Sequence, residues 1–151
     1  MNHAFEITNQ SRKIISELLQ NLSLEQLNKI PEGFNNNIIW NIGHIIVVQQ
    51  MLVYHLSDLP MLVSDEMVQK YKRGTKPEQD VTPSEIAEIQ SLLFESIAKT
   101  EVDYNRNTFK NYKEFTTMTG FNLKNVEDAL AFNYYHEAIH TGVIMGIKKF
   151  V

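Results

Sequence analysis

The sequence predicts an all-α protein, a four-helix bundle with a long connection between its second and third helices. Apolar residues recur every three or four positions in four long segments, and helix-start signals precede these segments. No segment alternates apolar and polar residues strongly enough to support a sheet. The 151 residues, 43% apolar and 21% charged, suit a single domain over residues 1–151 with one core.

The first helix is predicted to run to about Asn21, because apolar residues recur at helical spacing over positions 7–22. Ser23 and Gln26 then have the spacing of a capping box. We expect one short helical turn there, before Pro31 breaks the chain.

The second helix is predicted between the asparagine run at 35–37, whose side chains can cap it, and about Leu56. The connection that follows, residues 57–81, is long and charged, and a helical turn is expected over 65–72. A connection of this length lets the third helix run parallel to the second.

The third helix has the clearest start signal in the chain. Thr82 can cap it, Pro83 takes the first helical position and Glu85 the third. This helix is expected to end around 105–107, and the segment 109–120, which has no helical period, is expected to be a loop or extended turn.

The fourth helix is predicted to begin at Asn122 and to continue almost to Val151, since no proline interrupts it. His136 and His140 stand one turn apart on it, so both imidazoles can reach one ion. The positions that share their face are Ala129, Phe132, Ile139, Val143, Ile147 and Phe150. Because this face is apolar, the histidine pair is expected to point into the core.

His44 is a third inward histidine, because its face of the second helix is also largely apolar. His55 lies eleven positions further along, or about 16 Å, and is expected to be a hydrogen-bonded core residue, whereas His3 is expected to be solvated. One divalent ion would offset the cost of burying three imidazoles. The sequence therefore predicts one metal site built from His44, His136 and His140.

The composition of the chain excludes several classes of ligand and partner. The chain has no cysteine, so a metal must be held by nitrogen or oxygen, and the net charge of −4 leaves no basic surface for nucleic acid. The most apolar stretch, 38–56, is interrupted by polar residues and is not expected to span a membrane. The N-terminus lacks the apolar region of a signal peptide, so a cytoplasmic location is expected.

The segment from His136 to His140 matches the H-E-x-x-H pattern of zinc metallopeptidases, with Glu137 as the general base. The third ligand of such enzymes usually lies downstream, yet residues 141–151 hold no His, Asp or Glu, so a peptidase is the weaker alternative. Glu137 and His140 also have the E-x-x-H spacing of di-iron bundles, but the second pair is missing because position 41 is Asn. A mononuclear site for zinc or nickel, ahead of iron or manganese, is expected.

Two short motifs carry a resemblance to a known family. The first is Trp40-Asn41-Ile42-Gly43-His44 on the second helix, and the second is His136-x-x-x-His140-x-Gly142 on the fourth. They resemble the signatures of the DinB-like metal-binding four-helix bundles, which include bacillithiol-transferase and maleylpyruvate-isomerase relatives, and residues 70–77 resemble the usual connection before the third helix. The resemblance spans the chain and implies an up-down-down-up bundle with His44, His136 and His140 as metal ligands. Family members often carry Gln where this chain has Val143.

These features lead to a functional hypothesis. Three neutral histidines leave the charge of the ion uncompensated and a coordination position open, as in catalytic zinc sites. A thiol bound there would be held as thiolate, the nucleophile of thiol transfer. We expect a metal-dependent thiol S-transferase, or a related detoxification or isomerisation enzyme, acting on a small molecule with a low-molecular-weight thiol such as bacillithiol or glutathione. The alternative is a metal-binding stress or sensor protein without turnover.

The sequence alone leaves two interpretations for several polar residues near the predicted site. Glu137 is a candidate catalytic base, but lying about 100° round the helix from His136 it also fits a residue that orients a ligand or faces solvent. Asn41, Asn133 and Tyr54 are candidates to support the site, or ordinary buried polar residues.

The second helix is apolar on both sides, which bears on assembly. If His44 points inward, the residues on the far side are Ile38, Ile39, Ile42, Ile46 and Val53, together with Gln49 and Gln50. Either neighbouring helices cover this side or a second subunit does. A two-fold homodimer through this helix is expected.

Overall fold

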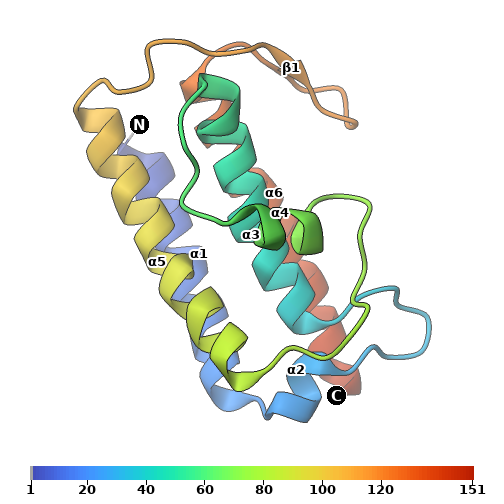
Figure 1. Cartoon of the computed structure of the whole chain (residues 1–151). Helices are drawn as coiled ribbons and strands as arrows, with labels where there is room; N and C mark the ends of the chain where they lie inside the picture. The colour runs from blue at the N-terminus through green and yellow to red at the C-terminus, as the bar shows by residue number, and fades with distance from the viewer. Residues whose placement is uncertain (1) are drawn as a thin grey trace.

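The computed structural model describes residues 2–151 and is built almost entirely of helices (Figure 1). The four long ones are α1 (Asn2–Asn21), α3 (Ile38–Val53), α5 (Pro83–Asn105) and α6 (Val126–Ile147). In Figure 1 the chain runs in one direction along α1 and α6 and in the other along α3 and α5. Helix α1 packs on α5 and α6, and α3 packs on the same two helices from the opposite side. The predicted all-α class is confirmed.

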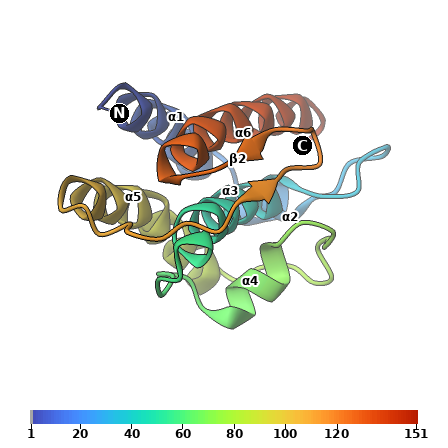
Figure 2. The same cartoon turned by 90° about the horizontal axis from the view of Figure 1, so that it is seen from above.

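Shorter elements connect the long helices. They are α2 (Leu24–Asn28), η1 (His55–Ser57), α4 (Asp65–Tyr71), the strands β1 (Phe115–Thr116) and β2 (Asn122–Leu123), and η2 (Lys148–Phe150). The helical turn predicted over 65–72 is thus present as α4, which packs on α3. Seen from above, the β1–β2 hairpin lies over α3 and α6 (Figure 2).

The predicted helix starts are confirmed by their hydrogen bonds. Ser23 and Gln26 form a reciprocal capping box at α2, and Thr82 and Glu85 form another at α5. Asn37 caps α3, since its Oδ1 accepts from the backbone N–H of Trp40 at 2.9 Å.

The start of the fourth helix was predicted wrongly. Asn125 caps α6, with its Oδ1 accepting from the N–H of Asp128 at 2.8 Å, whereas Asn122 lies in β2. Strand β2 pairs with β1 in an antiparallel hairpin, so a short sheet forms where none was expected, with β1 inside the segment 109–120 and β2 just after it. Gly120, with φ +87°, occupies the left-handed position that its turn requires.

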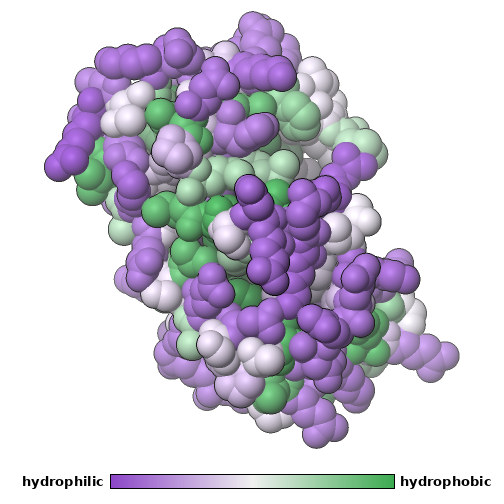
Figure 3. Space-filling view, viewed as in Figure 1, coloured by the Kyte–Doolittle hydropathy of each residue, from purple (hydrophilic) through white to green (hydrophobic). Residues whose placement is uncertain are grey.

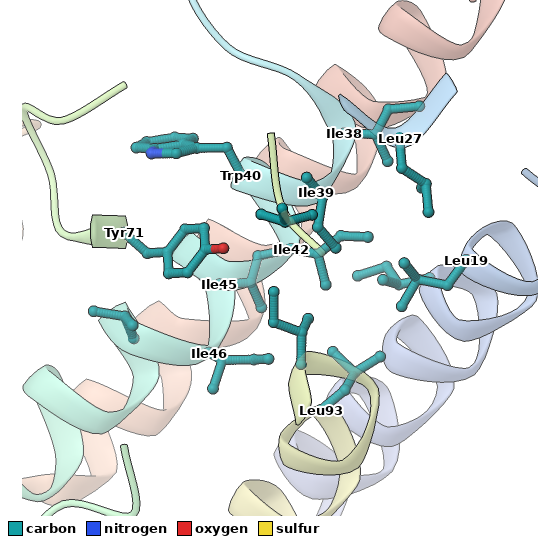
Figure 4. Close-up of a cluster of buried hydrophobic side chains, with 14 of the residues drawn as sticks. Leu19, Leu27, Ile38, Ile39, Trp40, Ile42, Ile45, Ile46, Tyr71 and Leu93 are labelled. Carbon is teal, nitrogen blue, oxygen red and sulfur yellow. The ribbon is translucent and has the colours of Figure 1, made fainter. Parts of the chain in front are cut away.

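Helix α3 is the centre of the core, because neighbours cover it on nearly every side. Figure 4 shows its isoleucines beside Leu19 of α1 and Leu93 of α5, in one buried cluster. Each isoleucine removed from water contributes roughly 1.5–3 kcal/mol, so this helix stabilises the bundle strongly. Polar side chains cover most of the face drawn in Figure 3, with apolar side chains visible in a band through its middle.

The surface on which the homodimer prediction rested is not available. Ile38, Ile42, Ile46 and Val53 are 0% exposed and Ile39 is 1% exposed within a single chain. Gln49 and Gln50 are also buried, and Gln49 Nε2 donates to Thr100 Oγ1 of α5 at 2.9 Å. Neighbouring helices, rather than a second subunit, cover the far side of α3. No helix within residues 2–151 has the length and apolar character to cross a membrane.

Candidate metal centre

The three predicted histidines come together, one from α3 and two from α6. Candidate ligand atoms of His44, His136 and His140 all lie within 4.8 Å of one another, and no other such cluster of three occurs among residues 2–151. The ring centroids are 5.2 Å apart for His44 and His136, 4.7 Å for His44 and His140, and 4.6 Å for His136 and His140.

This donor set fits one divalent metal ion. Zinc is bound by histidine nitrogen at about 2.0–2.1 Å in a tetrahedral arrangement, so the nitrogens on one ion are about 3.4 Å apart. Side-chain movements of about 1 Å would bring the three imidazoles from their present spacing to that one. Cysteine is absent from the chain, so the site offers imidazole nitrogen, which suits zinc, nickel, copper and iron.

His44 is held by α4 and by its own helix. Its Nδ1 donates to the backbone carbonyl of Tyr71 at 2.6 Å, and its ring stacks on Trp40 with centroids 4.8 Å apart. A carbonyl oxygen only accepts, so Nδ1 carries the proton and Nε2 keeps its lone pair for a metal.

Gly43 makes this contact with α4 feasible. A Cβ at this position would lie 2.6 Å from Cδ1 of Tyr71, well inside van der Waals contact. Glycine therefore lets the buried Tyr71 ring lie against the α3 backbone, which brings the Tyr71 carbonyl to His44. The glycine of the Trp40 to His44 motif is explained by this close approach.

His140 is oriented by Asn41, one of the candidate supporting residues. His140 Nδ1 donates to Asn41 Oδ1 at 2.8 Å. The amide nitrogen of Asn41 donates to the carbonyl of Asn37 at 2.7 Å and to Asn36 Oδ1 at 3.0 Å, so its oxygen faces His140. Hydrogen bonds of this kind fix the tautomer of a metal-binding histidine.

All three imidazoles are neutral at pH 7. Burial, followed by the neighbouring His140 and His44, lowers the pKa of His136 to about 3. Burial and His44 lower the pKa of His140 to about 4, and burial lowers the pKa of His44 despite the opposing hydrogen bond to Tyr71. His136 Nδ1 is buried without a hydrogen-bond partner among the described residues. Neutral rings with available nitrogens are the form that binds a metal.

The prediction that the face of His136 and His140 points into the core needs correction. Both rings are half-buried, and their neighbours Ile139 and Phe150 are 46% and 60% exposed. The buried face of α6 instead contains Asn133 and Glu137. The histidines therefore lie at the edge of the core, where a ligand can reach them.

Glu137 has a different role from the predicted base. Its side chain and that of Arg12 are 0% exposed and form an ion pair, with Nη2 to Oε1 at 2.8 Å and Nε to Oε2 at 3.3 Å. Asn133 Nδ2 also donates to Oε1 at 2.8 Å. With both oxygens engaged inside the bundle, Glu137 joins α6 to α1, which argues against the role of a base at the histidine cluster.

The Arg12 side chain was missed by the sequence analysis. It extends from α1 to α5 as well, where Nη1 donates to the Leu93 carbonyl at 2.6 Å and to Ser96 Oγ at 2.7 Å. The available signal was that Arg12 shares a helical face with Phe5, Ile15 and Leu19, which places a charged residue at a core position.

The remaining candidates lie outside the cluster. Tyr54 donates to Asp103 Oδ2 at 2.7 Å, and Asn133 contacts Glu137. His55 is exposed, so its predicted place in the core is wrong, and His3 is exposed as predicted, with Nδ1 2.7 Å from Glu6 Oε2.

A pocket of about 330 Å³ opens beside two of the histidines. Its residues come from α3, α6, the end of α4 and the β1–β2 hairpin. They are His44, Val48, Met51, Leu52, Lys72, Arg73, Phe115, Thr117, Met118, Thr119, Phe132 and His136. The pocket gives a small molecule access to the histidine cluster.

Fold and site together define a helical-bundle protein with a candidate three-histidine metal centre. The chain belongs to the DinB superfamily, whose family model matches residues 7–144. No curated protein matches the chain. A similar solved structure is the crystal structure of a conserved protein from Enterococcus faecalis, with a TM-score of 0.59 and 15% identity over 99% of this chain and 95% of that one. At this identity the likeness concerns the fold alone.

Proposed function

We propose that the protein binds one divalent metal ion, zinc or nickel, through His44, His136 and His140 and acts as a metal-dependent thiol S-transferase or a related detoxification or isomerisation enzyme. The observation that carries the proposal is the convergence of three neutral imidazoles beside a pocket of about 330 Å³. Three neutral ligands leave the charge of the ion unbalanced, which favours an anionic reactant.

The metal would supply a Lewis acid that lowers the pKa of a reactant thiol. The protein's own groups orient and enclose the reactants. The Tyr71 carbonyl and Asn41 hold two of the imidazoles in one tautomer, and Met51 and Phe132 supply apolar walls of the pocket. Because the chain has no cysteine, the thiol is a separate small molecule.

The peptidase alternative loses support from the position of Glu137. An H-E-x-x-H peptidase needs that carboxylate at the metal as a general base. Here it is fully buried and paired with Arg12. We therefore expect chelator-sensitive cleavage of casein to be undetectable, and reproducible cleavage that is lost in Glu137→Gln would reverse this ranking.

Metal analysis of the purified protein tests the binding step. About one ion per chain is expected, with binding lost in the His44→Ala, His136→Ala, His140→Ala triple variant. His55→Ala is the matched control, because His55 is exposed and outside the cluster, and should leave the stoichiometry unchanged. Full metal retention by the triple variant would refute the site.

Turnover separates the enzyme from a metal-binding stress or sensor protein. Zinc- and nickel-loaded protein is mixed with bacillithiol or glutathione and the electrophile monochlorobimane, and conjugate formation is followed by fluorescence. Acceleration that disappears in His44→Ala supports a transferase. A loaded protein that does not accelerate conjugation with either thiol would favour the non-catalytic alternative.

A further inference from the structure

The pocket beside the histidines carries charge of one sign only. Lys72 and Arg73, which directly follow α4, both line it, and the described residues that line it include no Asp or Glu. No carboxylate among the described lining residues offsets the two positive side chains, so the protein's own charges favour a negative group in this pocket.

Neither cation is neutralised by a carboxylate within residues 2–151. Lys72 Nζ donates to the amide oxygen of Gln69, and Arg73 Nη2 lies 2.7 Å from Met118 Sδ. The ion pairs of the described chain use other cations, namely Arg12, Lys70 and Lys99. Two positive groups with neutral partners at the rim of one pocket favour an anion.

Apart from the two histidines and two threonines of the hairpin, the rest of the pocket is apolar. Helices α3 and α6 supply Met51, Leu52 and Phe132, and the hairpin supplies Phe115 and Met118. The volume of about 330 Å³ is at the small end of the range for ligand sites, roughly 300–1,000 Å³. An apolar body of one ring or a short chain would fill it.

We propose that the substrate of this site is a small organic carboxylate with an apolar body. Its carboxylate meets Lys72 and Arg73, and its body lies between α3, α6 and the hairpin, beside the histidines. This inference rests on the proposed function in that it names the class of molecule on which the metal centre acts.

Isothermal titration calorimetry on the metal-loaded protein tests the inference with 4-phenylbutyrate, its neutral counterpart 4-phenylbutanamide, and acetate. The carboxylate with the apolar body should bind at least about tenfold more tightly than either the amide, which lacks the charge, or acetate, which lacks the body. In a Lys72→Gln, Arg73→Gln variant the preference for carboxylate over amide should fall to about twofold or less. Lys76→Gln, which removes one charge from the same connection outside the pocket, should bind as the wild type does.

The double variant also distinguishes the two cations from the metal as the group that attracts the carboxylate. A preference that survives in the double variant would place the carboxylate on the metal and overturn the inference. Equal binding of acid and amide to the wild type, or no measurable binding of 4-phenylbutyrate, would overturn it as well. Metal content measured on the same samples separates the two proposals. If the metal is missing but the preference for carboxylate over amide is intact, the result counts against the proposed function alone. If one metal is bound but the preference is absent, the result counts against this inference alone.

Discussion

At the scale of single residues, the positions of the candidate metal ligands depend on neighbouring groups that are not themselves candidate ligands. Gly43 admits the Tyr71 ring, the Tyr71 carbonyl fixes His44, and Asn41 fixes His140. Groups that orient metal-binding histidines typically change metal affinity by 10–100-fold when they are lost. The two motif glycines, Gly43 and Gly142, allow this dependence to be tested.

Gly43→Ala should displace Tyr71 and with it the hydrogen bond to His44. We expect a loss of about 1–3 kcal/mol in the free energy of unfolding and a fall in zinc affinity of roughly tenfold or more. Urea unfolding and competition with a zinc chelator measure the two effects. Gly142→Ala is the control, since its Cβ would meet nothing within 4 Å in a helix. It should stabilise the protein by up to about 1 kcal/mol and leave affinity unchanged, and equal losses in both variants would contradict the role given to Tyr71.

The lowered pKa values of the histidines predict a pH dependence for the metal-free protein. The pKa is about 3 for His136 and about 4 for His140, below the value of 6.5 for a free side chain. Above pH 6.5 neither state binds these protons, but as the pH falls towards 4 the unfolded chain binds them and the folded one does not. Chelator-treated protein should therefore lose stability between pH 6.5 and 4 in urea titrations. Replacing both residues by Leu should flatten that dependence, and an unchanged slope would show that other groups cause it.

At the scale of whole elements, the sequence predicted the helices because their signals are local. Capping boxes at Ser23 and Thr82 and apolar residues at helical spacing act within one turn or a few turns. The faces of α6 were harder to assign, because apolar residues occur all round this helix and only its neighbours select the buried side. The start of α6 was missed because Asn122 and Asn125 are both capable caps, and pairing with β1 places the first of them in a strand.

The predicted site shows the same contrast between features with a local sequence signal and features that depend on tertiary packing. His44, His136 and His140 were found because their spacing places two of them on one turn and the third on an apolar helix. The partner of Glu137 could not be found in this way, since Arg12 is 125 positions away in the chain and the pairing depends on how α1 packs against α6. Contacts of this kind arise from tertiary packing and leave no local pattern.

The ion pair of Arg12 and Glu137 predicts a stability effect that a catalytic glutamate would not show. Arg12→Met leaves a buried carboxylate unpaired and should cost roughly 3–5 kcal/mol in urea unfolding. The Arg12→Met, Glu137→Leu double variant removes both charges and should recover most of this loss, while retaining zinc binding. A double variant as unstable as the single one, or one that no longer binds zinc although it is folded, would contradict the structural assignment.

At the scale of the whole molecule, α3 is an internal helix rather than a docking surface. It carries His44, one of the three candidate metal ligands, and it is covered by α4, α5 and α6. The apolar far side that suggested a dimer is used to join these helices. The position of the candidate metal centre is consequently tied to the integrity of the core, since His44 cannot move without α3.

Charge placed on the far side of α3 should therefore unfold the chain instead of separating subunits. Ile39 and Ile46 are 1% and 0% exposed, so Ile39→Glu and Ile46→Glu each bury an unpaired carboxylate and should cost more than about 4 kcal/mol. Thermal unfolding followed by circular dichroism should show a broad or absent transition, with loss of zinc binding. Ile139→Glu, on the exposed side of α6 at 46% exposure, is the matched control and should stay within about 0.5 kcal/mol of the wild type. If light scattering instead showed that the α3 variants are folded monomers of a dimeric wild type, α3 would be a subunit interface and the packing described above would be wrong.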